Sequence, residues 1–164
     1  MQSLVVENDA GYRERLVHAL DKMHFRVRVA GSSGAALDLL SVNRFDLTVL
    51  DLGIPGPISG FELAKRISPR IGTILIGEKP FGEEFGGDSW THPFYYLRKP
   101  IDDRLFHSCL KAFSEQERRQ DEATQLRREV RQLRGKVPPG GTLHEVDDLW
   151  FGLFDRMRRS AGGD

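Results

Sequence analysis

One acidic residue ends an apolar run in the first half of the chain, and two other polar clusters supply what its chemistry would require. Asp51 follows the apolar run at residues 47–50, and Glu7 is followed by Asn8 and Asp9. Much later in the chain, Lys99 follows the aromatic run at residues 94–97. Oxygen ligands suit a hard divalent cation such as Mg²⁺, and a lysine suits a phosphoryl group. These residue types therefore predict a site for a divalent cation and a phosphoryl group.

Short apolar runs separated by helix-length patterns would position these side chains. The runs read as parallel β-strands at residues 4–6, 25–29, 47–51, 73–76 and 94–97. In a parallel sheet flanked by helices, ligands bind at the carboxyl ends of the strands. We therefore expect Glu7, Asp51 and Lys99 to lie close together at the carboxyl ends of the strands.

The strand over residues 25–29 indicates the order of the sheet. Arg26 and Arg28 alternate with apolar residues there, which is typical of an edge strand with one face in water. The pattern fits a doubly wound α/β fold of the flavodoxin-like type, with five parallel strands in the order 2-1-3-4-5. Helices are expected after the first three strands, with Asn8 or Asp9 capping the first and Ser32 or Ser33 capping the second.

This arrangement resembles the receiver domain of bacterial response regulators over roughly residues 3–112. The resemblance implies that Asp51 is the phosphoacceptor and that Lys99 contacts the phosphoryl group. A histidine kinase or a phosphotransfer protein would then supply the phosphoryl group. Lys99–Pro100 also fits the family's Lys-Pro step, for which the resemblance implies a cis peptide bond.

Several residues depart from the family's pattern, so the resemblance is to an atypical, degenerate receiver. The implied Mg²⁺ ligands are Glu7, Asn8, Asp51 and the backbone carbonyl of Gly53. Asn8 replaces a usual carboxylate, which keeps an oxygen ligand but removes a charge, so we expect a weakened metal site. The loop at residues 53–59 is also one residue longer than the family's loop.

The predicted switch is altered as well. Gly77 stands where the family has Thr or Ser, so a hydroxyl is missing, while Tyr96 matches the aromatic residue whose rotation reports phosphorylation. Glycines and a proline between residues 80 and 87 predict that no regular helix spans the stretch where the family has its fourth helix. Tyr96 has the alternative interpretation of a plain core aromatic.

The region after Pro100 predicts a helical appendage. The expected divisions are a receiver at residues 1–112, a coiled-coil extension of its last helix at 113–134, a Gly/Pro turn at 135–141, an amphipathic helix at 142–159 and a disordered tail at 160–164. Apolar stripes on the two helices predict a homodimer built from two helical hairpins. The stripes comprise Leu126, Val130, Leu133, Leu143, Val146, Trp150, Leu153 and Phe154.

Composition excludes several function classes. The chain has 24 basic and 24 acidic residues, so it has no charge excess that would attract nucleic acid or anionic lipid. It has no apolar run of about 18 residues and no signal-peptide pattern, so we expect a cytoplasmic protein without a membrane span.

The interpretation is therefore a signalling module in a two-component phosphorelay, and not an enzyme with a diffusible substrate. Two alternatives stay open. Lys99 could pair permanently with Asp51 in a phosphorylation-independent pseudo-receiver that serves as a scaffold, or the chain could be the N-terminal fragment of a transcriptional regulator.

Overall fold

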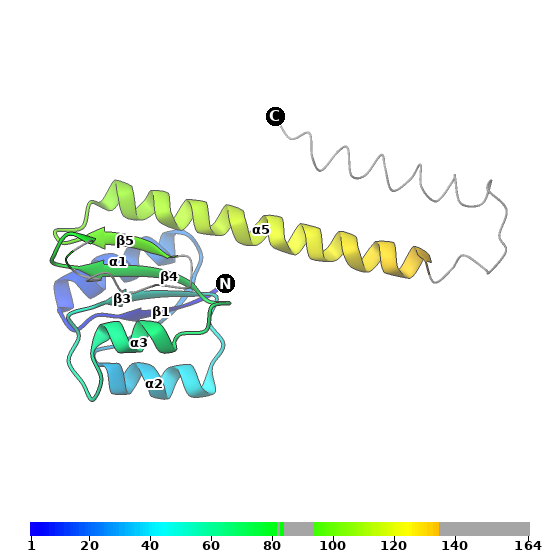
Figure 1. Ribbon diagram of the computed structural model, residues 1–164. Helices are drawn as coiled ribbons and strands as arrows, with labels where there is room; N and C mark the ends of the chain where they lie inside the picture. Colours follow the sequence, from blue (N-terminus) through cyan, green and yellow to red (C-terminus); the bar gives the residue numbers. More distant parts are fainter. Residues whose placement is uncertain (82, 84–93, 135–164) are drawn as a thin grey trace, which may run out of the picture. The chain divides into compact units, whose positions relative to one another are not determined.

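A computed structural model describes residues 1–81, 83 and 94–134 of the chain (Figure 1). The expectations for the fourth-helix stretch, the turn at 135–141, the helix at 142–159 and the tail lie outside the described residues. So do the stripe residues Leu143, Val146, Trp150, Leu153 and Phe154. The chain divides into two units, Met1–Ser114 and Glu115–Asp164, and the sheet and the site belong to the first.

Five strands form one parallel sheet in the order β2-β1-β3-β4-β5, which confirms the predicted fold. The strands are β1 (Gln2–Val6), β2 (Arg26–Ala30), β3 (Leu47–Asp51), β4 (Gly72–Gly77) and β5 (Tyr95–Arg98). Asp51 pairs in register with Ile76, and Gly77 pairs with Arg98. The carboxyl ends of β3, β4 and β5 therefore lie side by side at one edge of the sheet. β2 and β5 each begin and end one residue later than predicted.

Four helices are described, and Figure 1 labels them α1 (Ala10–Lys22), α2 (Ser33–Val42), α3 (Gly60–Arg66) and α5 (Asp103–Arg134). Asp9 caps α1 by accepting a hydrogen bond from the Tyr12 amide, and Ser32 caps α2. Each cap is one of the two residues that the sequence offered. The long α5 confirms the helix predicted after Pro100, and residues 101–134 contain no Gly or Pro that would interrupt it.

The sheet separates two apolar cores. α1 and the first turns of α5 pack on one face, where Leu16, Leu20 and Leu110 are buried against strand residues such as Val49. α2 and α3 pack on the other face. All five residues of β3 are buried, so Asp51 lies at the carboxyl end of a strand that is buried along its whole length.

The loop after β3 is fastened to the start of α2. The Ser33 amide donates to the Pro55 carbonyl at 2.9 Å, and the Ser33 hydroxyl donates to the Ile58 carbonyl at 2.7 Å. At the far end of the loop, a Cβ at Gly60 would lie 2.5 Å from the Leu52 carbonyl oxygen, so this close approach of two backbones requires glycine. The loop that carries Gly53 is therefore braced at both ends.

Within the described part of the chain, no helix is long and apolar enough to cross a membrane.

Candidate functional site

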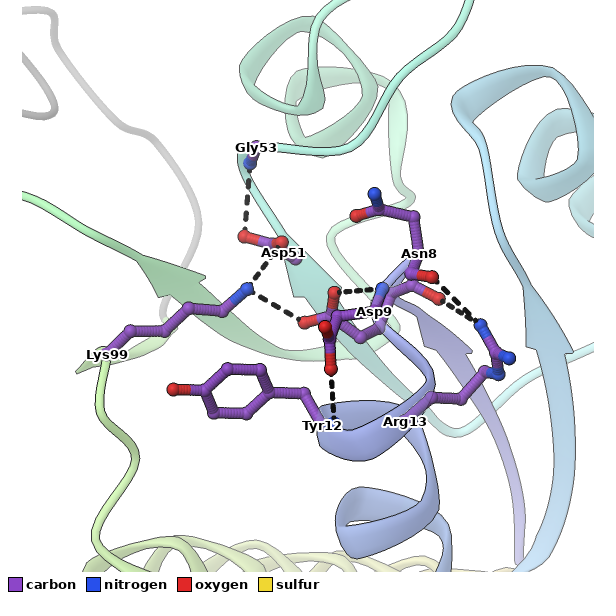
Figure 2. Close-up of polar contacts among 8 residues, drawn as sticks. Asn8, Asp9, Tyr12, Arg13, Asp51, Gly53 and Lys99 are labelled. Carbon is purple, nitrogen blue, oxygen red and sulfur yellow. Dashed lines mark hydrogen bonds and ion pairs between the residues drawn. The ribbon is translucent and has the colours of Figure 1, made fainter.

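The structure brings Glu7, Asp51 and Lys99 together at the carboxyl ends of β1, β3 and β5. Figure 2 shows Lys99 reaching toward Asp51. The Lys99 Nζ lies 2.8 Å from Asp51 Oδ2 and 3.0 Å from Glu7 Oε2. One ammonium group thus bridges two carboxylates from different strands. The Lys99–Pro100 peptide bond, directly after this lysine, is cis, as the resemblance implied.

Burial makes this bridge necessary. Glu7 is fully buried and Asp51 is 4% exposed, and two neighbouring buried carboxylates would be costly to ionise without a compensating cation. Burial by itself would lower the pKa of Lys99, but the hydrogen bonds and charges of Asp51 and Glu7 outweigh it and raise that pKa above its ordinary value. Lys99 therefore carries its positive charge at every physiological pH.

Backbone groups hold the remaining carboxylate oxygens. Asp51 Oδ1 accepts a hydrogen bond of 3.1 Å from the Gly53 amide, and Glu7 Oε1 accepts one of 2.9 Å from the Asp9 amide. The Arg13 guanidinium donates to the carbonyls of both Glu7 and Asn8, at 3.2 Å each. The loop after β1 is thus tied to the first turns of α1, and both carboxylates have fixed orientations.

An open depression surrounds these groups. The predicted residues Asn8 and Gly53 are exposed and line it together with the exposed Glu78. Glu78 is not among the site residues predicted from the sequence. Its position directly after the last residue of β4 was the available signal, since strand ends carry the site in this fold.

The donor set fits a hard divalent cation in its chemistry. Carboxylates of Glu7 and Asp51, the amide oxygen of Asn8 and the Gly53 carbonyl are all oxygen ligands of the kind that Mg²⁺ prefers. Yet each carboxylate already has one oxygen on Lys99 and one on a backbone amide. Among the described residues, no three His, Cys, Asp or Glu side chains are placed as a ready metal cluster. A metal ion would therefore have to compete with the Lys99 ammonium.

Gly77 and Tyr96, the two predicted switch residues, are in direct contact. A Cβ at Gly77 would lie 2.4 Å from the Tyr96 hydroxyl oxygen and 3.1 Å from Tyr96 Cε2. The same hydroxyl donates a hydrogen bond to the Lys79 carbonyl, and Phe81 packs edge-on against the Tyr96 ring at 5.6 Å between centroids. The space of a side chain at position 77 is therefore filled by Tyr96.

This contact predicts that a side chain at position 77 would clash with the Tyr96 hydroxyl. Gly77→Ala should lower the free energy of unfolding by about 1–3 kcal/mol, because the new methyl group overpacks the site. The loss should be smaller when Gly77→Ala is made in a Tyr96→Phe background, which removes the nearest atom. Urea unfolding of the two single variants and the double variant measures the difference. Equal losses in both backgrounds would show that the Tyr96 hydroxyl is not the source of the conflict.

Comparison with known proteins gives a consistent family assignment. Residues 4–77 match the model of the response regulator receiver domain. The transcriptional regulatory protein AfsQ1 of Streptomyces coelicolor is 32% identical over 117 residues, which cover 66% of this chain and 49% of that protein. This chain thus spans about half the length of that curated relative.

Solved receiver structures share the fold. A CheY-like response regulator receiver domain from Methylobacillus flagellatus is 25% identical with a TM-score of 0.55, covering 69% of this chain and 98% of its own. The chemotaxis response regulator CheY4 of Vibrio cholerae is 21% identical with a TM-score of 0.59, covering 68% of this chain and 97% of its own.

Proposed function

This chain carries a response regulator receiver domain, and from that premise we propose that Asp51 accepts a phosphoryl group from a histidine kinase or a phosphotransfer protein. The observation that supports this most is the placement of Asp51. Its carboxylate lies at the end of β3 on an open depression, 2.8 Å from the Lys99 ammonium. Its second carboxylate oxygen accepts a hydrogen bond from the Gly53 amide.

The proposed transfer asks little of the protein beyond positioning and charge neutralisation. A carboxylate oxygen of Asp51 attacks phosphorus, the bond from phosphorus to the donor's imidazole nitrogen breaks, and its electron pair stays with that nitrogen. Lys99 would neutralise negative charge that builds on the phosphoryl oxygens. Glu7, Asp51, Asn8 and the Gly53 carbonyl would hold Mg²⁺, which when bound supplies further charge neutralisation.

The atypical residues shape what would follow transfer. Gly77 has no hydroxyl to hold a phosphoryl oxygen, and Tyr96 already fills the adjoining space. We therefore propose that phosphorylation moves Tyr96 little. Asn8 contributes no charge to the metal site, so Mg²⁺ should bind less tightly than it would to a second carboxylate.

A phosphorylation-independent pseudo-receiver is the second candidate, and one observation favours it. Lys99 bridges both carboxylates, so the site already has a counter-ion of its own that holds the two acidic side chains together. In that case the domain would act as a signalling scaffold through protein contacts.

Intact-mass analysis separates these two functions. After incubation with acetyl phosphate and Mg²⁺, the parent chain should gain the mass of one phosphoryl group, and Asp51→Asn should gain none. Asn8→Asp should raise the rate or the lifetime of the adduct, because it restores a carboxylate to the metal site. No adduct on the parent at high Mg²⁺ would favour the pseudo-receiver, and an adduct that survives Asp51→Asn would identify a different acceptor.

We further propose that the domain forms a homodimer through its C-terminal helices. Leu126 and Val130 are four residues apart and so share one face of α5, and Leu133 continues the same face. Most side chains around them at residues 115–132 are exposed and polar. Helices in water are stabilised mainly by packing of an apolar face against a partner, which a second copy of the chain would supply.

Light scattering on the full chain tests the dimer. The parent should be a dimer at micromolar concentration, and Leu126→Asp with Val130→Asp should shift it to a monomer by placing charge in the helix contact. Thr124→Asp, which adds one negative charge on the other side of α5, should remain dimeric, and so should the chain with the apolar Leu126→Met in place of Leu126→Asp and Val130→Asp. A parent monomer, or a chain truncated after Ser114 that still dimerises, would rule out self-association through these helices.

A further inference from the structure

The Lys99 ammonium has three N–H groups, and the two carboxylates engage only part of it. Asp51 and Glu7 approach at 2.8 and 3.0 Å. The ring of Tyr12 lies on another side, with Lys99 Nζ over its face at 4.6 Å from the ring centroid (Figure 2). An aromatic face attracts an ammonium group at this distance and also shields it from water. The Lys99 side chain is accordingly only 14% exposed.

Two contacts position Tyr12, one through its backbone and one through its ring. On the backbone side, the Tyr12 amide donates a 2.8 Å hydrogen bond to Asp9 Oδ1 at the start of α1. On the ring side, the Arg15 guanidinium lies over the ring at 5.8 Å from its centroid. Arg15 is itself bound to Asp103 at 2.6 Å, in the first turn of α5, and donates to the Ile101 carbonyl at 3.3 Å. The ring is therefore held between the start of α1 and the start of α5.

We propose that Tyr12 is a positioning residue that holds the Lys99 ammonium between Glu7 and Asp51. Neither the sequence pattern nor the receiver fold assigns it this role. The contacts form a continuous series from Asp103 through Arg15 and Tyr12 to Lys99. The inference rests on the proposed function of Asp51 and Lys99 in one respect, namely that the position of Lys99 governs what the site can bind.

That position has a consequence for metal binding. Because Lys99 and a divalent cation would share the oxygens of Glu7 and Asp51, a firmly held ammonium disfavours the metal. Loss of the ring contact should free Lys99 and strengthen Mg²⁺ binding by about two- to five-fold, the size expected from one cation–aromatic contact that is partly open to water.

Side-chain NMR of the full chain tests the role of Tyr12 without any phosphodonor or metal. A hydrogen-bonded, shielded ammonium exchanges its protons slowly, so Lys99 should give a resolved ¹⁵N-bound resonance at low temperature, assigned by its loss in Lys99→Met. The resonance should persist in Tyr12→Phe, which keeps the ring. It should broaden or vanish in Tyr12→Leu and in Tyr12→Met, which keep the bulk without the aromatic face.

Mg²⁺ titration, followed by the amide shifts of Glu7 and Gly53, supplies the second measurement. Tyr12→Leu should bind about two- to five-fold more tightly than the parent, and Tyr12→Phe should match the parent. A Lys99 resonance that is absent from the parent, or unchanged in both Tyr12→Leu and Tyr12→Met, would overturn the proposal.

The two proposals can fail separately. If acetyl phosphate leaves Asp51 unmodified while the Lys99 resonance depends on the Tyr12 ring as described, the acceptor function of Asp51 is contradicted. The positioning role of Tyr12 is then still supported. If Asp51 is phosphorylated and the Lys99 resonance is unchanged in the Tyr12 variants, the positioning role of Tyr12 is wrong and the acceptor function of Asp51 is supported.

Discussion

The bridge from Lys99 to Glu7 and Asp51 controls the arrangement of the side chains at the carboxyl ends of the strands. Two carboxylates that are nearly or fully buried can lie together only if a cation is placed between them. That requirement constrains three strands at once, because β1, β3 and β5 must end at the same edge of the sheet. The parallel register of the strands satisfies this requirement. Because every residue of β3 is buried, Asp51 at its end is buried as well.

Gly77 has no side chain, yet the space beside it is not empty. The Tyr96 ring takes up the space, and its hydroxyl bonds to the Lys79 carbonyl. Lys99 is the counter-ion of both Glu7 and Asp51, and the absence of a side chain at Gly77 leaves room for the Tyr96 ring. The arrangement of side chains at the carboxyl ends of the strands is therefore set by packing and by Lys99.

The fold was largely predictable because its signals are local. Apolar runs of strand length, capping residues before each helix and a stretch without Gly or Pro after residue 100 appear directly in the sequence. The strand order followed from Arg26 and Arg28, whose alternation with apolar residues predicted that β2 lies at the edge of the sheet. Strand ends were predicted less accurately, since ladder pairing and not residue type decides where β2 and β5 begin.

The contacts that refine the site were not predictable in this way. The ring of Tyr12 over Lys99 joins residues far apart in the sequence, and periodicity carries no information on such a pair. In the sequence, Tyr12 reads only as one apolar position of an amphipathic helix. Ser33 looked like a second helix cap, whereas its buried hydroxyl braces the loop after Asp51. Both roles depend on how distant segments meet in space.

A double-mutant cycle on Lys99 and Asp51 measures how strongly the bridge couples these two residues. Lys99→Met alone leaves two buried carboxylates without their cation, while Lys99→Met in an Asp51→Asn background leaves only Glu7. If the bridge is the controlling interaction, urea unfolding should give a coupling free energy of at least about 1 kcal/mol, with the lysine substitution less costly in the Asp51→Asn background. Additive effects of the two substitutions would contradict the account.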